Sequence, residues 1–241
     1  MKKTVLITGA NRGIGLGLVK EFLKNDYRVI ATCRQPSKAE LLNEIARENT
    51  SLHIYQLDVN CESDFIKLKQ ELKDIGIDTL IANAGIKGYD NPERRTMAFW
   101  EFTSKEMNAA YETNVTGAHM TIKTFLPLVN QSQDRAIFAM GSGIGSIADN
   151  QSGGSAPYRC SKSALHQLIE TVDRDCRNST TYSSIIAATL IPGFVKTDMG
   201  GPNARLTVEE CCSRLYQRIQ EVIESRETNK LIMHDRSAMP F

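Results

Sequence analysis

Short apolar runs alternate with longer amphipathic stretches along almost the whole chain. The short runs consist of β-branched and aliphatic residues, as in buried strands, and the longer stretches repeat apolar residues at helical spacing. Strands are predicted at 4–8, 28–33, 52–57, 79–82, 135–140, 184–191 and 231–233. Helices are predicted at 13–25, 37–48, 62–73, 105–129, 157–177 and 207–225, separated by an irregular stretch at 86–104 and a Gly/Ser-rich loop at 141–156.

This alternation predicts an α/β fold, a doubly wound (Rossmann) parallel sheet of about seven strands with helices on both faces. No Pro/Ser linker, repeat or shift of composition divides the chain, so we expect one domain over residues 1–241. Ligands of such sheets bind beyond the carboxyl ends of the strands. The loops that follow the strands are therefore where chemistry is expected.

Composition and charge exclude several classes of protein. The chain has 29 Lys and Arg against 28 Asp and Glu, a net charge of +1, which argues against nucleic-acid or membrane partners. The run Val5-Leu6-Ile7 is too short for a signal peptide or a membrane span. The six cysteines and four histidines lack metal-ligand spacing. We expect a reduced, cytoplasmic protein without a metal site, its histidines at the surface or at helix caps, and the Cys211-Cys212 pair half in the core.

The first predicted strand leads into Thr8-Gly9-Ala10-Asn11-Arg12-Gly13-Ile14-Gly15, and a predicted helix follows directly. Glycines at these positions allow a tight turn and a close approach to a pyrophosphate, whose charge then lies at the helix N-terminus. Because the turn joins a strand to a helix, it predicts a dinucleotide site. The predicted contact residues are Gly9, Asn11, Arg12, Gly13, Ile14 and Gly15.

The end of the second predicted strand indicates which dinucleotide binds. NAD-specific folds carry an acidic residue there for the ribose 2′-hydroxyl. This strand ends Ala31-Thr32-Cys33-Arg34, without a carboxylate. Arg34 and Arg12 could together bind a 2′-phosphate, although Arg34 could also be an ordinary solvated charge. NADPH (NADP) is favoured over NADH.

Tyr158 and Lys162 stand four residues apart in a predicted helix and therefore share one face of it. An ammonium close to the phenol is expected to lower its pKa, which would make Tyr158 a general acid for a carbonyl oxygen. The spacing alone is common. Its position after the Gly/Ser-rich loop, on the side of the sheet where the dinucleotide is expected, strengthens the interpretation.

These features resemble a known family. The glycine turn, Asp58-Val59, Asn83-Ala84-Gly85, Asn114, Ser142, Tyr158 with Lys162, and Pro192-Gly193 occur in the order typical of single-domain short-chain dehydrogenases/reductases. The resemblance covers essentially the whole chain. Thr32-Cys33-Arg34 and the stretch 192–201 are similar to the carbonyl-reductase branch that contains the Sniffer-like and C-factor-like proteins.

The resemblance implies roles for the matching residues. Tyr158 would donate a proton, Lys162 would assist it and bind the nicotinamide ribose, and Ser142 would hydrogen-bond the substrate carbonyl. Asn114 would hold a water that links Lys162 to solvent. The implied cofactor contacts are Asp58 to the adenine, Asn83 and Gly85 to the adenosine ribose, Thr197 to the nicotinamide amide, and in addition Val59, Ala84, Pro192, Gly193 and Val195.

Two departures from the family pattern leave questions open. Ala82 stands where the family commonly has a second asparagine. Ser142 lies farther before Tyr158 than the family serine often does, and Ser146 lies at the more usual distance. We prefer Ser142 because it follows the strand directly, and reach to the carbonyl decides the role.

The implied activity is NADPH-dependent reduction of a small-molecule aldehyde, ketone or quinone. The alternative is a signalling or interaction protein that binds NADP(H) mainly for structure. By resemblance we also expect a homo-oligomer, a dimer or tetramer. The aromatic residues within 87–102 are expected to pack on their own domain in preference to lining the substrate mouth or a docking surface. Glycines within 199–204 suggest a mobile substrate loop.

Overall fold

The computed structural model describes residues 2–228 and 231–241. Within them, seven strands form one sheet in the order β3-β2-β1-β4-β5-β6-β7, and every neighbouring pair is parallel. The strands are β1 Thr4–Ile7, β2 Arg28–Cys33, β3 Leu52–Gln56, β4 Thr79–Ala82, β5 Ala136–Met140, β6 Ile186–Ile191 and β7 Leu231–Met233. The predicted doubly wound parallel sheet is confirmed.

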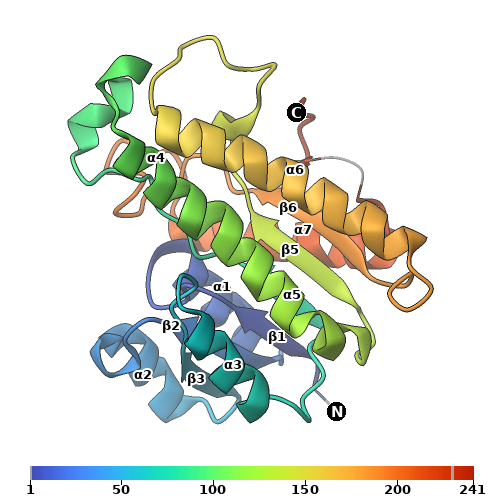
Figure 1. Cartoon of the computed structure of the whole chain (residues 1–241). Helices are drawn as coiled ribbons and strands as arrows, with labels where there is room; N and C mark the ends of the chain where they lie inside the picture. Colours follow the sequence, from blue (N-terminus) through green and yellow to red (C-terminus); the bar gives the residue numbers. More distant parts are fainter. Residues whose placement is uncertain (1, 229–230) are drawn as a thin grey trace.

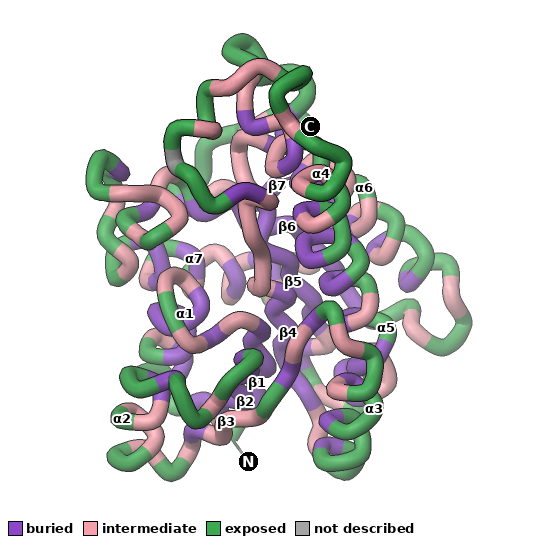
Figure 2. The backbone as a smooth tube through the Cα atoms, turned by 60° about the vertical axis from the view of Figure 1, so that its left-hand side comes forward, coloured by how far each residue is buried: buried purple, intermediate pink, exposed green. Residues whose placement is uncertain are grey.

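Helices cover both faces of this sheet (Figure 1). The helices are α1 Gly13–Lys24, α2 Glu40–Glu48, α3 Glu62–Glu71, α4 Ser104–Tyr111, α5 Gly117–Asn130, α6 Ala156–Asn178 and α7 Val208–Ser225. Helices α1, α2 and α7 pack on one face, and α3, α5 and α6 pack on the other. The strands are buried along most of their length, whereas the outward surfaces of the helices are exposed (Figure 2).

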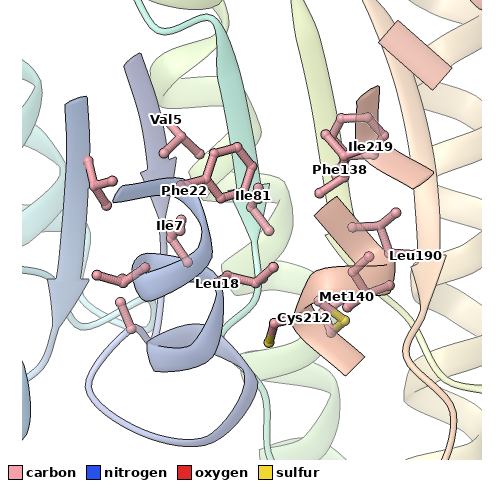
Figure 3. Packing of buried hydrophobic residues seen from close by; sticks show 14 of the residues in the cluster. Val5, Ile7, Leu18, Phe22, Ile81, Phe138, Met140, Leu190, Cys212 and Ile219 are labelled. Atoms are coloured by element: carbon pink, nitrogen blue, oxygen red, sulfur yellow. The ribbon is translucent and has the colours of Figure 1, made fainter. Parts of the chain in front are cut away.

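Alternation along the strands supplies one core on each face of the sheet. In β1, Val5 and Ile7 contribute to the core beneath α1 and α7, where Phe22 of α1 lies (Figure 3). Leu6 contributes to the opposite core, which includes Phe125 of α5. Successive side chains of a strand point to opposite faces, so a strand covered on both sides is apolar throughout. Burial of both faces of the sheet therefore explains why the predicted strands are uninterrupted apolar runs.

The order of the strands reverses between β1 and β4, which are neighbours in the sheet. Such a reversal opens a crevice beyond the carboxyl ends of the two strands, because their connections leave in opposite directions. The loops at this crevice are the glycine turn after β1 and Asn83-Ala84-Gly85 after β4. The topology therefore brings together two motifs that are far apart in the sequence.

Two predicted helices are interrupted. The helix predicted at 37–48 is a 3₁₀ turn, Pro36–Lys38, followed by α2, because Ala39 between them has a non-helical backbone (φ −88°, ψ 65°). The helix predicted at 105–129 is α4 and α5 joined by a π-helical segment, Glu112–Thr116. Its i→i+5 bonding inserts an extra residue into the turn and changes the direction of the side chains, and such segments often occur at functional sites.

Short 3₁₀ turns also occur in the segments predicted to be irregular, at Pro92–Thr96, Phe99–Glu101 and Gly143–Gly145. Cys211 and Cys212 lie near the N-terminus of α7 and are both buried, so the expectation of a half-exposed pair is wrong. Across the described residues, no helix combines the length and apolarity needed to cross a membrane.

Candidate active site

The glycine turn after β1 is closely packed against the loop after β4. Gly9 has a left-handed backbone (φ +63°), and a Cβ there would lie 2.9 Å from Ala84 Cα. A Cβ on Gly15 would lie 2.4 Å from the Gly9 carbonyl oxygen and 2.6 Å from Asn83 Nδ2. Only glycine fits these two positions without displacement. The turn leaves the backbone of the α1 N-terminus open to a ligand, as pyrophosphate binding requires.

Asn83 fixes this arrangement from the β4 side. Its Nδ2 donates to the carbonyl oxygens of Thr8 (2.9 Å) and Gly9 (3.2 Å). The Thr8 hydroxyl in turn accepts hydrogen bonds from the backbone N–H of Asn83 (3.0 Å) and of Ala84 (3.1 Å). The side chain of Asn83 thus binds the protein itself. Thr8 is a member of the site that the prediction did not include among the contact residues.

Arg12 and Arg34 are the two arginines that were predicted to bind a 2′-phosphate. Arg12 donates to Asp198 at 2.9 Å, an exposed ion pair that joins the glycine turn to the segment after β6. Arg34 is exposed directly after β2. Asp58 is half-buried after β3, and Val59 is buried where a Cβ on Gly117 would touch it. Asp198 was not singled out by sequence reasoning, because no motif pairs it with Arg12.

Tyr158 lies in the first turn of α6, and Ser142 follows β5 after one residue; both side chains line the same cleft, and Ser142 acts to lower the pKa of Tyr158. Ser146 is buried and accepts a hydrogen bond from the backbone N–H of Asp149 (3.2 Å), so its hydroxyl supports the local turn. Of the two candidate serines, Ser142 is the one that the structure places next to the tyrosine.

Lys162 lies one turn farther along α6 and is 3% exposed. Its Nζ donates to the Met140 carbonyl oxygen at 2.7 Å and lies 5.6 Å from the centre of the Tyr158 ring. A Cβ on Gly85 would lie 3.4 Å from this Nζ and 3.0 Å from Asn114 Oδ1. Lys162, Asn114 and the loop after β4 therefore meet behind the tyrosine.

Asn114 is located in the π-helical segment and binds the loop after β4 through both ends of its amide. Its Oδ1 accepts from the Ile86 N–H (2.8 Å), and its Nδ2 donates to the Ile86 carbonyl (2.8 Å) and to Ser161 Oγ (2.9 Å). An asparagine can satisfy a backbone segment in this way because it has both donors and an acceptor. The structure thus gives Asn114 a positioning contact that the implied water-binding role did not include.

Burial is the main cause of the pKa shifts of Tyr158 and Lys162. Desolvation raises the pKa of Tyr158 to about 12, although the hydrogen bond from Ser142 acts in the opposite direction. Desolvation lowers the pKa of Lys162 to about 8. The net shift of the Tyr158 pKa is therefore upward, because desolvation of the phenolate outweighs the stabilisation expected from the Lys162 ammonium, which lies over the ring and also binds Met140. At neutral pH the phenol is protonated and the lysine is charged.

Tyr158 and Ser142 line an open cleft. Predicted cofactor residues from two loops line it, namely Ile14, Pro192, Gly193, Val195 and Thr197. The segment after β4 also lines it, through Lys87, Tyr89 and Arg95. The expectation that 87–102 packs only on its own domain is therefore wrong. Phe99 and Trp100 are 71% and 75% exposed, since short 3₁₀ turns hold them away from the core.

His166 is a further residue of the site that sequence reasoning placed incorrectly at the surface. It is 3% exposed on α6, and its Nε2 lies 3.4 Å from the Ser142 backbone N–H, which donates to it. Desolvation lowers its pKa to about 4, so the ring is neutral and can accept this bond. Its spacing of four residues from Lys162 on the same helix was the available signal.

The chain is similar to known proteins both in sequence and in structure. The short chain dehydrogenase family model matches residues 3–205. An uncharacterised oxidoreductase of Schizosaccharomyces pombe is 32% identical over 202 residues, which cover 82% of this chain and 75% of that protein. The carbonyl reductase Sniffer of Drosophila melanogaster superposes with a TM-score of 0.89 at 31% identity, covering 100% of both chains. The NADPH-bound carbonyl reductase from chicken fatty liver has a TM-score of 0.87 at 31% identity, covering 100% of this chain and 99% of the other.

The chain belongs to the short-chain dehydrogenase family. It is an oxidoreductase of that family, as the order of its motifs predicted.

Proposed function

We propose that this protein is an NADPH-dependent carbonyl reductase that acts on small aldehydes, ketones or quinones. The observation that carries the proposal is that Tyr158 and Ser142 line the same cleft as Ile14 of the glycine turn and Thr197, the residue expected to bind the nicotinamide amide. The similarity to two carbonyl reductases, one of them with bound NADPH, supports the same conclusion.

The residues present fit a phosphorylated dinucleotide. Gly9 and Gly15 form a turn in which added Cβ atoms would collide with the backbone, so the peptide groups can approach a pyrophosphate. At the end of β2, Arg34 is exposed, and no acidic residue occupies the position that NAD-specific folds use. A guanidinium can bind a 2′-phosphate through charge-assisted hydrogen bonds. Bound NADPH would supply the hydride that reduces the carbonyl carbon.

The side chains around the cleft perform the remaining steps. Ser142 and Tyr158 donate hydrogen bonds to the substrate oxygen, which acquires negative charge during reduction. Tyr158 then transfers its proton to that oxygen. The transfer is favourable because the alkoxide is a stronger base than the phenolate that remains on Tyr158. The Lys162 ammonium behind the ring stabilises the resulting phenolate by charge. Asn114 keeps Ile86 and the loop after β4 in place.

The substitution Tyr158→Phe tests this function. The variant retains the ring but has no proton to donate, so kcat/KM for carbonyl reduction is expected to fall about 10²- to 10⁴-fold, the usual contribution of general acid catalysis. NADPH oxidation is followed at its absorbance band with a panel of aldehydes, ketones and quinones, and NADPH affinity is measured by fluorescence.

Unchanged NADPH affinity together with lost turnover supports the proposal. The proposal is rejected if the wild-type protein binds NADPH and oxidises it with none of the carbonyl compounds. Full retention of activity by Tyr158→Phe would equally remove the tyrosine from the mechanism. The substitution Ser146→Ala is the matched control, because Ser146 supports the local turn and does not line the cleft.

A further inference from the structure

Two cationic side chains, Lys87 and Arg95, line the mouth of the cleft, and no carboxylate is among the residues that line it. Neither cation has an ion pair within the described part of the chain. Arg94, next to Arg95 in sequence, shows the contrast, because it is bound to Glu106 at 2.8 Å. The ion pair with Glu106 neutralises the charge of Arg94 within the protein, whereas the guanidinium of Arg95 can bind a ligand in the cleft.

The backbone holds Lys87 in place. The preceding residue, Ile86, is bound at both its N–H and its C=O by Asn114. The following residue, Gly88, has φ +88°, and a Cβ there would lie 2.6 Å from the Glu106 carbonyl oxygen. Lys87 thus enters the cleft from a segment that is tightly packed on α4.

Arg95 is positioned by a chain of hydrogen bonds from the α6 N-terminus. Its carbonyl oxygen accepts from Ser155 Oγ at 2.9 Å, and the same hydroxyl lies 2.8 Å from the Tyr89 hydroxyl. The Arg95 guanidinium stacks over the Phe194 ring, 4.9 Å from its centre. This cation–π contact aligns the guanidinium with the apolar wall of the cleft but leaves its charge uncompensated.

The two cations are close enough to repel each other. The pKa of Lys87 is lowered first by burial and then by the charge of Arg95, which also lowers the pKa of Arg159, second to burial. Like charges held together without a counterion are unfavourable, and an anion placed between them removes that cost. The apolar residues Ile144, Phe194 and Met199 line the rest of the cleft and would receive the body of such a ligand.

We propose that the cleft selects carbonyl substrates with an apolar body and a carboxylate, which Lys87 and Arg95 bind while Tyr158 and Ser142 receive the carbonyl oxygen. The inference rests on the proposed reductase function and specifies its substrate class. The two cations determine specificity and take no part in the transfer of hydride or proton.

Three benzaldehydes that differ at the para position test the proposal: 4-formylbenzoate, its methyl ester, and the 4-trimethylammonio compound. The ester and ammonium groups withdraw electrons and make the aldehyde more electrophilic, so intrinsic reactivity opposes a preference for the carboxylate. For the wild-type protein at low salt, kcat/KM is expected to be at least about tenfold higher for the carboxylate than for the ester, and lowest for the cation.

In the double variant Lys87→Met/Arg95→Met, the carboxylate-to-ester ratio is expected to fall by about tenfold, and added salt is expected to lower the wild-type ratio. The matched control is Arg47→Met/Lys123→Met, which removes the same charge from two exposed positions away from the cleft, on α2 and α5. Its ratio is expected to equal that of the wild type. Calorimetric titration of the three aldehydes into the NADP⁺ complex gives the same comparison without turnover.

Equal kcat/KM for carboxylate and ester in the wild type, or a preference that survives the double substitution, would overturn the proposal. Weaker NADPH binding by the double variant, with an unchanged ratio, would also overturn it and would assign the cations to the cofactor phosphates. Binding of the carboxylate to the NADP⁺ complex without reduction of any aldehyde would uphold the charge selection and reject the reductase function, so that the two failures are distinguishable.

Discussion

Lys162 shows how burial decides the chemistry of a single residue. Its ammonium is enclosed between α6, the end of β5 and the loop after β4, and it donates to the Met140 carbonyl. Enclosure lowers its pKa to about 8, while Tyr158 beside it has its pKa raised to about 12. The lysine therefore changes charge closer to physiological pH than the phenol does. Loss of its charge removes the group that stabilises the phenolate formed during reduction.

This assignment predicts a decline in activity at alkaline pH. Lys162 is charged below its pKa, so kcat/KM for carbonyl reduction is expected to be constant near pH 7 and to fall about tenfold per pH unit above about pH 8. The measurement is a pH profile of kcat/KM at saturating NADPH. NADPH affinity over the same range is the control, and a rate that stays constant to pH 10 would contradict the assignment.

At the scale of elements, the turn between β1 and α1 can pack closely against the loop after β4 because glycines occupy the positions of contact. Gly9 approaches the backbone of Ala84, and Gly15 lies against the Gly9 carbonyl and Asn83. Glycine within a helix costs about 1 kcal/mol relative to alanine. Gly15 is nevertheless required in α1, since close approach of the turn to the helix is what shapes the pyrophosphate cradle.

Gly15→Ala tests this contact. The new methyl group would lie 2.4 Å from the Gly9 carbonyl oxygen, so the turn must move. We expect a loss of about 1–3 kcal/mol in the free energy of unfolding, despite the better helix propensity of alanine, and at least tenfold weaker NADPH binding. Urea denaturation and NADPH fluorescence titration provide the two measurements.

Gly76→Ala is the matched control, because the nearest atom to its Cβ would lie 3.8 Å away, which is an ordinary contact. It is expected to leave NADPH affinity unchanged. If Gly15→Ala also left both quantities unchanged, the cradle would not depend on this glycine.

At the scale of the whole molecule, desolvation lowers the pKa of three of the four histidines. Desolvation lowers the pKa of His166 to about 4, and it lowers the pKa values of His53 and His234 as well. A histidine whose folded pKa lies below its unfolded value takes up protons more readily on unfolding. Stability is therefore complete above about pH 6.5 and is lost as the pH falls toward 4.

The free energy of unfolding is accordingly expected to fall by roughly 2 kcal/mol between pH 7 and pH 5 through His166 alone. Urea denaturation at the two pH values measures it. His166→Gln should reduce this pH dependence, whereas His119→Gln, at an exposed helical position, should preserve it. A pH dependence that is the same in all three proteins would show that His166 does not contribute.

Local patterns in the sequence determined much of this protein. Apolar runs such as Val5-Leu6-Ile7 predict strands covered on both faces, and the glycines at 9, 13 and 15 predict a tight turn, because these preferences depend on neighbouring residues alone. The ordered motifs from Thr8 to Pro192 also predicted the family, which the comparisons confirm.

Only the tertiary structure decided which groups face one another. The salt bridge of Arg12 with Asp198, the π-helical turn at Asn114 and the burial of His166 each depend on segments brought together from distant parts of the chain. The charges at the cleft also depend on tertiary structure, since packing of the loop after β4 on α4 and the α6 N-terminus places Lys87 and Arg95 in one cleft whose described lining contains no carboxylate. Desolvation and charge proximity are properties of three-dimensional surroundings, and linear spacing does not contain them.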